Sequence, residues 1–310
     1  KHEAEELEEG EEEDAELFPE MLSFAQTADM GVRENYEKLL TLVDMDSLIE
    51  YYCAQTYLAR QGDWPNSNWA AWRTRENEHT AYGDCRWRWM LFDENSSGIG
   101  KKNIAHDSVF HLLGNDIFFP FLLRSNEFRE RFVTALMDMG NIVFAKERVN
   151  DWIDAYLARM GETLTYSQER FYGGNKDASD LEEAADEIRE FFEKRQPYVE
   201  KSLKETLELT GEVTELTVTV RIEGEDGDDP LLTDALLVNG HNVRLRDGGY
   251  TGRYFSDFPV ELTVRDEKRG FRFVGWEGDF TSEESTLRIV PSNEAGTRLC
   301  AVFARTSLKE

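Results

Sequence analysis

Three polar residues in the first third of the chain have the types and the spacing that phosphate chemistry needs. Asp63 follows a long apolar segment, and Asn68 comes five residues later within QGDWPNSNWAAWR. Asp-x4-Asn is the spacing of the catalytic loop in protein kinases, where the Asp accepts the proton of the substrate hydroxyl and the Asn holds a metal ion. One short loop then aims two oxygen groups at one phosphate.

Asp93 is the third of these residues. It ends the run RWRWMLF, in which Arg86 and Arg88 alternate with tryptophans at the period of a β-strand, and it opens the polar loop DENSSGIG. In kinases a metal-binding Asp directly follows a strand downstream of the catalytic loop. Mg²⁺ takes hard oxygen ligands and keeps several waters, so Asn68 and Asp93 would suffice as the protein's share.

Both carboxylates also have an ordinary structural explanation. Asp63 can begin a turn around Pro65, because Asp and Asn are common in turns, and Asp93 can cap the polar loop that follows it. The tryptophans that flank the first loop can wall a site or anchor the loop to the helices, and anchoring is the favoured interpretation. They are Trp64, Trp69 and Trp72.

The segment from Leu17 to about Gly211 is predicted to be mostly helical. Ser47 with Glu50 has the spacing of a capping box and opens the apolar helix SLIEYYCAQTYLAR, which leads to Asp63. Ser125 is predicted to cap NEFRERFVTALMDMGNIVF, and Ser179 with Glu182 repeats the capping box at DLEEAADEIREFFEKR. Pro197 suits the first turn of a further helix, which Gly211 would end.

The hydrophobic period changes after Gly211. The runs LTVTVRI, PVELTV, FRFVGW and LCAVFA are short, apolar or alternating, and separated by turns. Asn239-Gly240 is a strong hairpin signal between LLV and HNVRL. We therefore expect an α+β protein with three parts: an acidic tail or linker at residues 1–16, a helical lobe at 17–211 and a small antiparallel β-sandwich at 212–310.

The composition restricts the partners. The formal net charge is −28, which repels phosphate backbones, so we expect no nucleic-acid partner and favour a basic partner or substrate. The charge can equally serve solubility alone. Three cysteines do not make a disulfide framework. No apolar run approaches the roughly 20 residues of a membrane-spanning helix.

The combined motifs resemble those of the CotH family of atypical protein kinases. The order is DMDSLIEYYCAQTYLARQGDWPNSNWAAWR, then CRWRWMLFDENSSGIG, then FFPFLLRSNEFRERFVTALMDMGNIVFAKERV. The later text YTGRYFSDFPVELTV and GFRFVGWEGDF is similar to a β-module that often follows this kinase domain. The resemblance covers roughly residues 20 to 305 and identifies the helical lobe as the C-terminal portion of such a kinase.

The resemblance implies transfer of phosphate from ATP to Ser or Thr of protein substrates with Mg²⁺ or Mn²⁺. By matching position, Asp63 would be the catalytic residue, and Asn68 and Asp93 would be metal ligands, with Asn66 as an alternative to Asn68. Substrates of the family include basic, Ser-rich coat proteins, which would suit an acidic enzyme. The family's association with spore coats and secreted proteins favours an extracytoplasmic location, at the cell surface or in the spore coat.

Three features depart from the family pattern. No Gly-rich loop or phosphate-pairing Lys on a strand is readable before Asp63, so we expect this chain to lack the lobe that grips ATP. Many relatives carry Asp-x-Asp after the tryptophan-rich strand, and here the second acid is replaced by Asn95. The separation of Asp63 from Asp93 exceeds that in ordinary kinases. These departures support an alternative, a non-catalytic binding or adhesion protein of the cell surface or spore coat.

Overall fold

The structure is a computed structural model of the whole chain. It describes residues 7–172, 178–225, 230–265, 267–268, 270–292 and 295–306. The first six residues of the predicted acidic tail therefore lie outside the described residues. The chain divides into two compact units: Lys1–Gly140 with Phe144–Leu207, and Asn141–Val143 with Glu208–Glu310.

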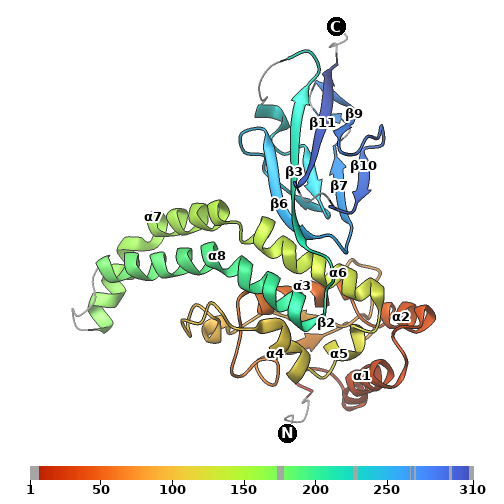
Figure 1. Cartoon of the computed structure of the whole chain (residues 1–310). Helices are drawn as coiled ribbons and strands as arrows, with labels where there is room; N and C mark the ends of the chain where they lie inside the picture. Colours follow the sequence, from red (N-terminus) through yellow and green to blue (C-terminus); the bar gives the residue numbers. More distant parts are fainter. Residues whose placement is uncertain are drawn as a thin grey trace. The chain divides into compact units, whose positions relative to one another are not determined.

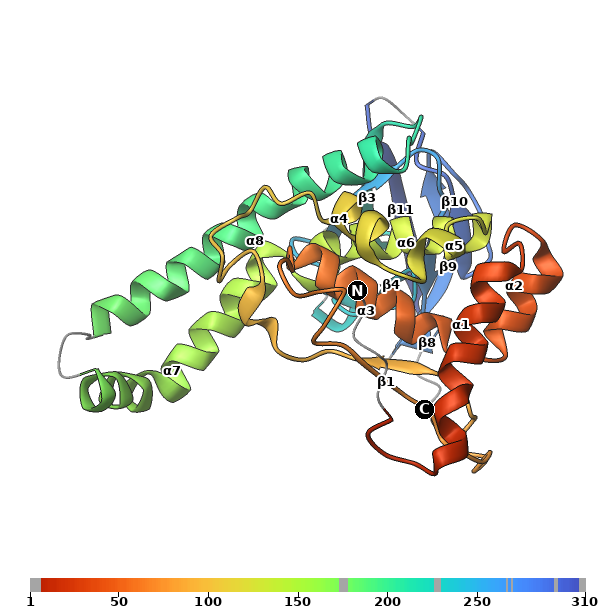
Figure 2. The same cartoon turned by 90° about the horizontal axis from the view of Figure 1, so that it is seen from below.

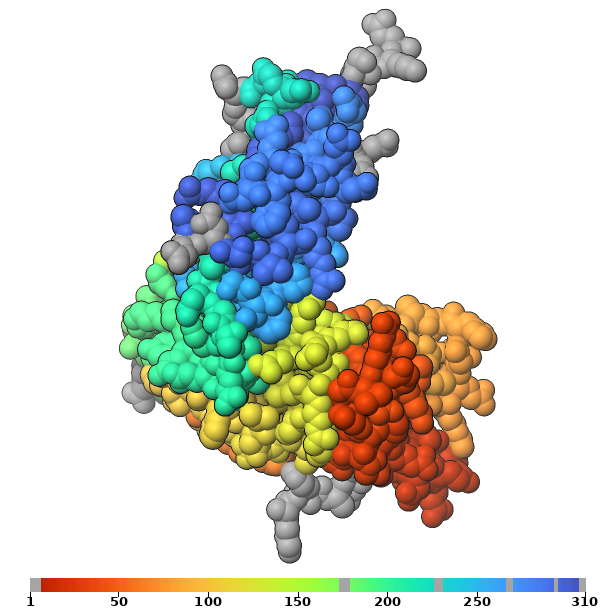
Figure 3. Space-filling model, turned by 45° about the vertical axis from the view of Figure 1, so that its right-hand side comes forward, coloured from red at the N-terminus to blue at the C-terminus, as the bar shows by residue number. Residues whose placement is uncertain are grey.

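The first unit is mainly helical (Figure 1). Its α-helices are α1 Leu17–Thr27, α2 Arg33–Leu40, α3 Met45–Tyr57, α4 Ser108–Asn115, α5 Phe119–Leu122, α6 Asn126–Asp138, α7 Lys146–Phe171 and α8 Ala178–Thr206. Short 3₁₀ turns occupy Glu12–Glu16 and Glu94–Ser96, and a π-helical turn at Met139–Val143 follows α6. In the space-filling view, α1 and α2 (red) lie against α6 (yellow-green) (Figure 3).

α3 is the most buried helix at the centre of this unit, with nine of its 13 residues buried. Its predicted N-cap was wrong by one turn. Asp44, three residues before Ser47, is the N-cap, and its carboxylate accepts the Ser47 backbone N–H at 3.3 Å. An ionised Asp at this position also complements the positive end of the helix dipole. The predicted cap of α6 is confirmed, since the Ser125 hydroxyl accepts from Phe128 N at 3.3 Å.

α7 and α8 lie side by side as a long helical hairpin (Figures 1 and 2). The prediction of a helix boundary at Pro197 was wrong, because α8 continues through it to Thr206. A proline inside a helix removes one hydrogen bond and costs about 3 kcal/mol. Packing of buried residues such as Phe191 and Val199 on both sides of Pro197 outweighs that cost.

The two strands of the first unit are short and antiparallel. β1 is Ala70–Trp72 and β2 is Arg88–Met90, and Ala71 pairs with Trp89. The predicted strand RWRWMLF is therefore shorter than expected. β1 follows Asn68 and β2 precedes Asp93, so this pairing brings the two candidate loops to the same end of the ribbon.

The second unit contains two β-sheets (Figure 1). Its strands are β3 Val213–Ile222, β4 Leu236–Val238, β5 His241–Asn242, β6 Gly249–Phe255, β7 Val260–Val264, β8 Glu267–Lys268, β9 Phe271–Gly278, β10 Thr286–Ile289 and β11 Thr297–Arg305. The sheet orders are β10-β7-β4-β5 and β6-β3-β11-β9-β8. Alternating inward residues of β3, Leu216, Val218, Val220 and Ile222, are buried.

Among the described strands of this unit the pairing is antiparallel except for the parallel pair of β3 and β11. β3 and β11 are the first and last strands, and a parallel pair requires a long connection, which the strands between them supply. The predicted hairpin is confirmed: Asn239 and Gly240 have φ of 49° and 80° and join β4 to β5. The predicted α+β class is likewise confirmed. None of the described helices is long and apolar enough to cross a membrane.

Candidate active site

The first candidate loop begins where α3 ends. Ala59 takes a left-handed conformation with φ of 57°, and Arg60 N donates to Gln55 O at 3.0 Å, which closes the helix. The Asp63 carbonyl then accepts from Asn66 N and Ser67 N at 2.9 and 2.8 Å. The turn expected around Pro65 therefore forms, and it uses the backbone of Asp63. Oδ1 of the Asp63 carboxylate also accepts from Trp64 N at 2.9 Å, so the side chain is partly committed to the same turn.

The second candidate loop is attached to the first by backbone hydrogen bonds. Gln61 N donates to Ser96 O at 3.2 Å, and Gly98 N donates to Leu58 O at 2.8 Å. Gly98 has to be glycine for this approach, because an added Cβ would lie 2.6 Å from the Ala59 Cβ and 2.9 Å from the Asn103 carbonyl oxygen. The two loops are therefore held as one layer.

The three residues predicted from their spacing, Asp63, Asn68 and Asp93, lie next to one another where the two loops are joined. Asn68 Nδ2 donates to Asp63 Oδ2 at 2.5 Å and to Asp93 Oδ2 at 2.7 Å. Asn68 and Asp93 both have left-handed backbones, with φ of 55° and 54°, a conformation that Asn and Asp adopt more readily than most residues. Asn66, the alternative to Asn68, is exposed and lines a neighbouring pocket instead.

Arg60 is the member of the cluster that sequence reasoning missed. Its side chain is fully buried, and it donates from Nε and Nη2 to the two carboxylate oxygens of Asp63 at 3.3 and 3.1 Å. Its Nη1 donates to Phe92 O at 3.3 Å and lies 3.2 Å from Glu94 Oε1. The available signal was an arginine at the end of an apolar helix, three residues before the candidate Asp.

Glu94 is the second residue that sequence reasoning missed. Among the described residues its two enclosed oxygens have no hydrogen-bond partner, and its contact with Arg60 is an ion pair. Asn95, the position of the lost acid, makes a local contact instead, accepting from Ser96 Oγ at 3.3 Å. The acid next to Asp93 that faces the cluster is therefore Glu94, one residue earlier than the family pattern indicated.

Burial and ion pairing shift the pKa values of these groups in opposite directions. Burial alone would raise the pKa of Asp63, but hydrogen bonds from Arg60 and Asn68 lower it below its usual value. Burial raises the pKa of Glu94, and Arg60 only partly offsets this. For Arg60, burial opposes the charge while Asp63 and Glu94 raise the pKa. Asp63 is thus held ionised at neutral pH.

The oxygen groups fit a divalent cation. Two carboxylates share one amide, and rotating that amide by half a turn would place Asn68 Oδ1 where Nδ2 now lies. The set would then be one carboxylate oxygen of Asp93 and the amide oxygen of Asn68, with the Asp63 carboxylate beside them, and these are hard ligands of the kind that Mg²⁺ and Mn²⁺ take. Among the described residues no three His, Cys, Asp or Glu side chains converge, so the amide and waters would be essential to the set.

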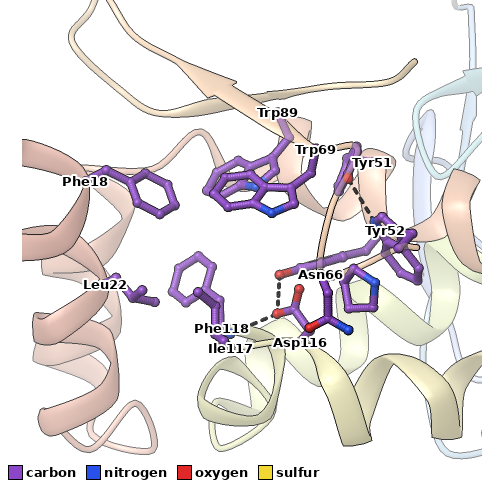
Figure 4. A pocket seen from close by; sticks show the side chains of 12 residues that line it. Phe18, Leu22, Tyr51, Tyr52, Asn66, Trp69, Trp89, Asp116, Ile117 and Phe118 are labelled. Atoms are coloured by element: carbon purple, nitrogen blue, oxygen red, sulfur yellow. Dashed lines mark hydrogen bonds between the residues drawn. The ribbon is translucent and has the colours of Figure 1, made fainter. Parts of the chain in front are cut away.

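An aromatic pocket lies beside the first loop (Figure 4). Its lining residues are Phe18, Leu22, Tyr51, Tyr52, Trp64, Pro65, Asn66, Trp69, Trp89, Asp116, Ile117 and Phe118. Trp64 is buried and anchors the loop, donating from Nε1 to Tyr51 Oη at 2.8 Å, while His111 Nε2 contacts Trp64 O at 2.7 Å. Asp116 Oδ1 accepts from the Tyr52 hydroxyl at 2.8 Å on the pocket floor.

The tryptophans therefore divide the roles that the sequence left open. Trp64 anchors the loop, Trp69 walls the pocket with its ring centroid 5.5 Å from that of Phe18, and Trp72 is exposed on β1. The loop residues 63–69 thus serve two places: Asp63 and Asn68 belong to the charged cluster, and Trp64, Pro65, Asn66 and Trp69 belong to the pocket.

Comparison of the chain with models of protein families identifies a family whose model covers this arrangement. The model of the CotH kinase protein family matches residues 1–199. The chain belongs to the CotH family. The match includes the whole charged cluster and the pocket, and it connects the chain to kinases at the level of the family, with the ATP, divalent metal and protein substrates that kinases use in general. No significant match was found among curated proteins or solved structures.

Proposed function

We propose that this chain is the catalytic-loop and metal-binding part of a CotH protein kinase that transfers phosphate from ATP to Ser or Thr of protein substrates. The observation that carries the proposal is the Asn68 amide, which hydrogen-bonds to Asp63, five residues before it, and to Asp93, 25 residues after it. Two loops, one after α3 and one after β2, deliver the three residue types of a phosphoryl-transfer site to one point.

Asp63 would receive the hydroxyl of the acceptor residue. Its lowered pKa makes it a weak base at neutral pH but a permanent hydrogen-bond acceptor. That role suffices if the transition state is loose, because the hydroxyl oxygen then forms its bond to phosphorus late and the proton moves to Asp63 late. The bond between phosphorus and the departing ADP oxygen breaks in the same step.

Asn68 and Asp93 would hold the divalent cation. When bound, Mg²⁺ or Mn²⁺ would neutralise charge on the phosphate oxygens. Without it the cluster keeps excess negative charge, since Arg60 contacts two carboxylates, those of Asp63 and Glu94, and Asp93 adds a third through the Asn68 amide.

The pocket beside the loop offers a place for a side chain of the acceptor protein. Trp64, Pro65, Asn66 and Trp69 of its lining belong to the loop that carries Asp63 and Asn68, so a polypeptide whose hydroxyl reaches Asp63 would pass close to the pocket. The strongly acidic composition favours a basic, Ser-rich acceptor.

We propose an extracytoplasmic location, at the cell surface or in the spore coat, because the family is associated with spore coats and secreted proteins. Fractionation of cells and spores, followed by detection with an antibody to this chain, would test it.

The second candidate function is a non-catalytic binding or adhesion protein. The observation that favours it is the two-pronged contact of Arg60 with Asp63, which occupies the candidate base, together with Asn95 at the position of a family acid. In that case the cluster would be a structural remnant that fastens the two loops.

Phosphate transfer from labelled ATP separates the two functions. The assay uses the longest native form that contains this segment, Mg²⁺ or Mn²⁺, and a basic Ser-rich acceptor. We expect transfer by the parent and by Asp46→Ala, which removes an exposed acid in the first turn of α3. Asp63→Ala and Asp93→Ala should each abolish transfer while the circular dichroism spectrum stays that of the parent. A folded parent that neither transfers phosphate nor binds nucleotide would exclude the kinase.

A further inference from the structure

The Arg60 guanidinium contacts three partners through two of its edges. The Nε and Nη2 edge meets Asp63 in the first loop, and Nη1 meets Phe92 O and Glu94 in the second. The side chain is fully buried, so water does not compete for these contacts. A lysine would carry the same charge, but a single ammonium cannot reproduce a planar fork with donors on two edges.

The partners of Arg60 come from both sides of the proposed metal site. Asp63 is on the loop that carries Asn68, and Phe92 and Glu94 are the two neighbours of Asp93. Arg60 therefore holds the Phe92 backbone and the Glu94 side chain, on either side of Asp93, and at the same time the carboxylate of Asp63. Asn68 then spans the remaining distance between the two acids, at 2.5 and 2.7 Å.

We propose that Arg60, acting with Glu94, is the positioning residue that holds the loop of Asp63 and Asn68 against Asp93, so that Asn68 and Asp93 can bind one divalent cation beside the Asp63 carboxylate. Its contribution to phosphate transfer rests on the proposed function above. Its contribution to cation binding does not, because that depends only on where the two carboxylates are held. Arg60 is not a ligand, and its effect is exerted through the two loops.

A positively charged side chain near a metal site that acts by its charge alone would weaken metal binding, whereas a positioning residue would strengthen it. Removing a positive group next to the carboxylates would strengthen the binding of another cation. Removing a positioning residue would weaken it, because the carboxylates would separate. The sign of the change on neutralising Arg60 therefore distinguishes positioning from a simple charge effect.

The test measures binding of Mn²⁺ alone to the full chain, by the loss of the free-ion signal in electron paramagnetic resonance. We expect Arg60→Gln and Arg60→Lys each to weaken Mn²⁺ binding at least tenfold. The matched control is Arg195→Lys, since Arg195 is equally buried but donates to neutral oxygens rather than to the carboxylates of the cluster. It should bind Mn²⁺ within twofold of the parent. Unchanged or tighter binding by Arg60→Gln would overturn the proposal.

Glu94→Asp covers the case in which neither Arg60 variant folds. It keeps the charge but withdraws the carboxylate from Nη1, so positioning predicts weaker Mn²⁺ binding, and an unchanged affinity contradicts it. A parent that does not bind Mn²⁺ also overturns the proposal. If the parent binds Mn²⁺ in an Arg60-dependent way but transfers no phosphate, the kinase proposal fails and this inference stands.

Discussion

The first unit contains two fully buried arginines, and the regions around them are built in opposite ways. Arg195 on α8 donates to carbonyl oxygens of Tyr57, Thr56, Ile104 and His106 and to the Ser108 hydroxyl. Burial without a paired carboxylate lowers the pKa of Arg195 to about 10. Arg60 instead meets two carboxylates, which raise its pKa.

The difference indicates which buried charge serves structure and which serves a site. Neutral oxygens hold Arg195 in one place and offer nothing that a ligand could take over. The carboxylates around Arg60 outnumber it, so that region retains charge for a second cation to neutralise. A buried charge with too few opposite partners is a better sign of function than burial itself.

The largest expected effect is the loss of stability when Arg195, the arginine with a structural role, is replaced. Arg195→Met removes hydrogen bonds to five oxygens and leaves buried carbonyls without donors. We expect the free energy of unfolding to fall by about 3–5 kcal/mol, measured by urea unfolding. Arg124→Met, which removes an arginine that lies over the Phe121 ring, is the control and should change it by less than about 1 kcal/mol. A loss at Arg195 as small as that of the control would contradict the structural role.

The two acids of the cluster should respond in opposite directions. Asp63→Asn deprives Arg60 of its two-pronged partner and should lower the metal-free unfolding free energy by about 2–3 kcal/mol. Asp93→Asn removes repulsion between carboxylates that share Asn68 and should leave stability equal or raise it by up to about 1 kcal/mol. Parallel urea titrations without metal measure both. Equal losses from the two substitutions would show that the pairing described here is not the dominant contact.

Acid should weaken the region around Arg195 through His106. Burial, then the nearby His111 and Arg195, lower the pKa of His106 from 6.5 to about 4. The unfolded chain therefore takes up a proton near pH 6.5 that the folded chain refuses until about pH 4, so stability falls as pH drops through that window. Because the side chain is partly exposed, we expect about 1–2 kcal/mol.

Urea unfolding of the parent and of His106→Asn at pH 7 and pH 4.5 measures this contribution. The variant should lose less stability than the parent between the two pH values. His79→Asn is the matched control, because His79 is exposed and its left-handed backbone suits Asn. An identical pH dependence in the parent and His106→Asn would exclude the proposed source.

The smallest effect concerns the pocket that shares the loop with the charged cluster. Ile117→Trp fills the pocket without touching Asp63, Asn68 or Asp93. We expect KM for the protein acceptor to rise about tenfold, which is about 1.4 kcal/mol, with kcat within twofold. Val290→Trp, at an exposed position in the second unit, should change neither. A fall in kcat with unchanged KM would place the effect in the cluster rather than in acceptor binding.

Local signals made part of the fold predictable. The Ser125 cap and the Asn239-Gly240 hairpin depend on a few adjacent residues, and both were predicted correctly. Ser47 failed because Asp44 offers the same chemistry one turn earlier, and sequence alone does not rank the two. Pro197 failed because packing along α8 overrides a local preference.

The candidate site was also predictable only in part. Asp63, Asn68 and Asp93 could be named from type and spacing, and the structure brings them together, although their roles stay predictions. Arg60 and Glu94 could not be named. Their importance comes from a contact between residues 34 positions apart in sequence, which no local pattern encodes.

The parallel pair of β3 and β11 has a mechanical consequence. The two strands are the first and last of the second unit, and they pair from Leu216–Thr297 to Ile222–Phe303 while running in the same direction. Tension applied to the start of β3 and the end of β11 pulls them past each other along their length. The hydrogen bonds between them are then loaded together rather than opened one after another from an end, so this unit is built to transmit force along the chain without unzipping.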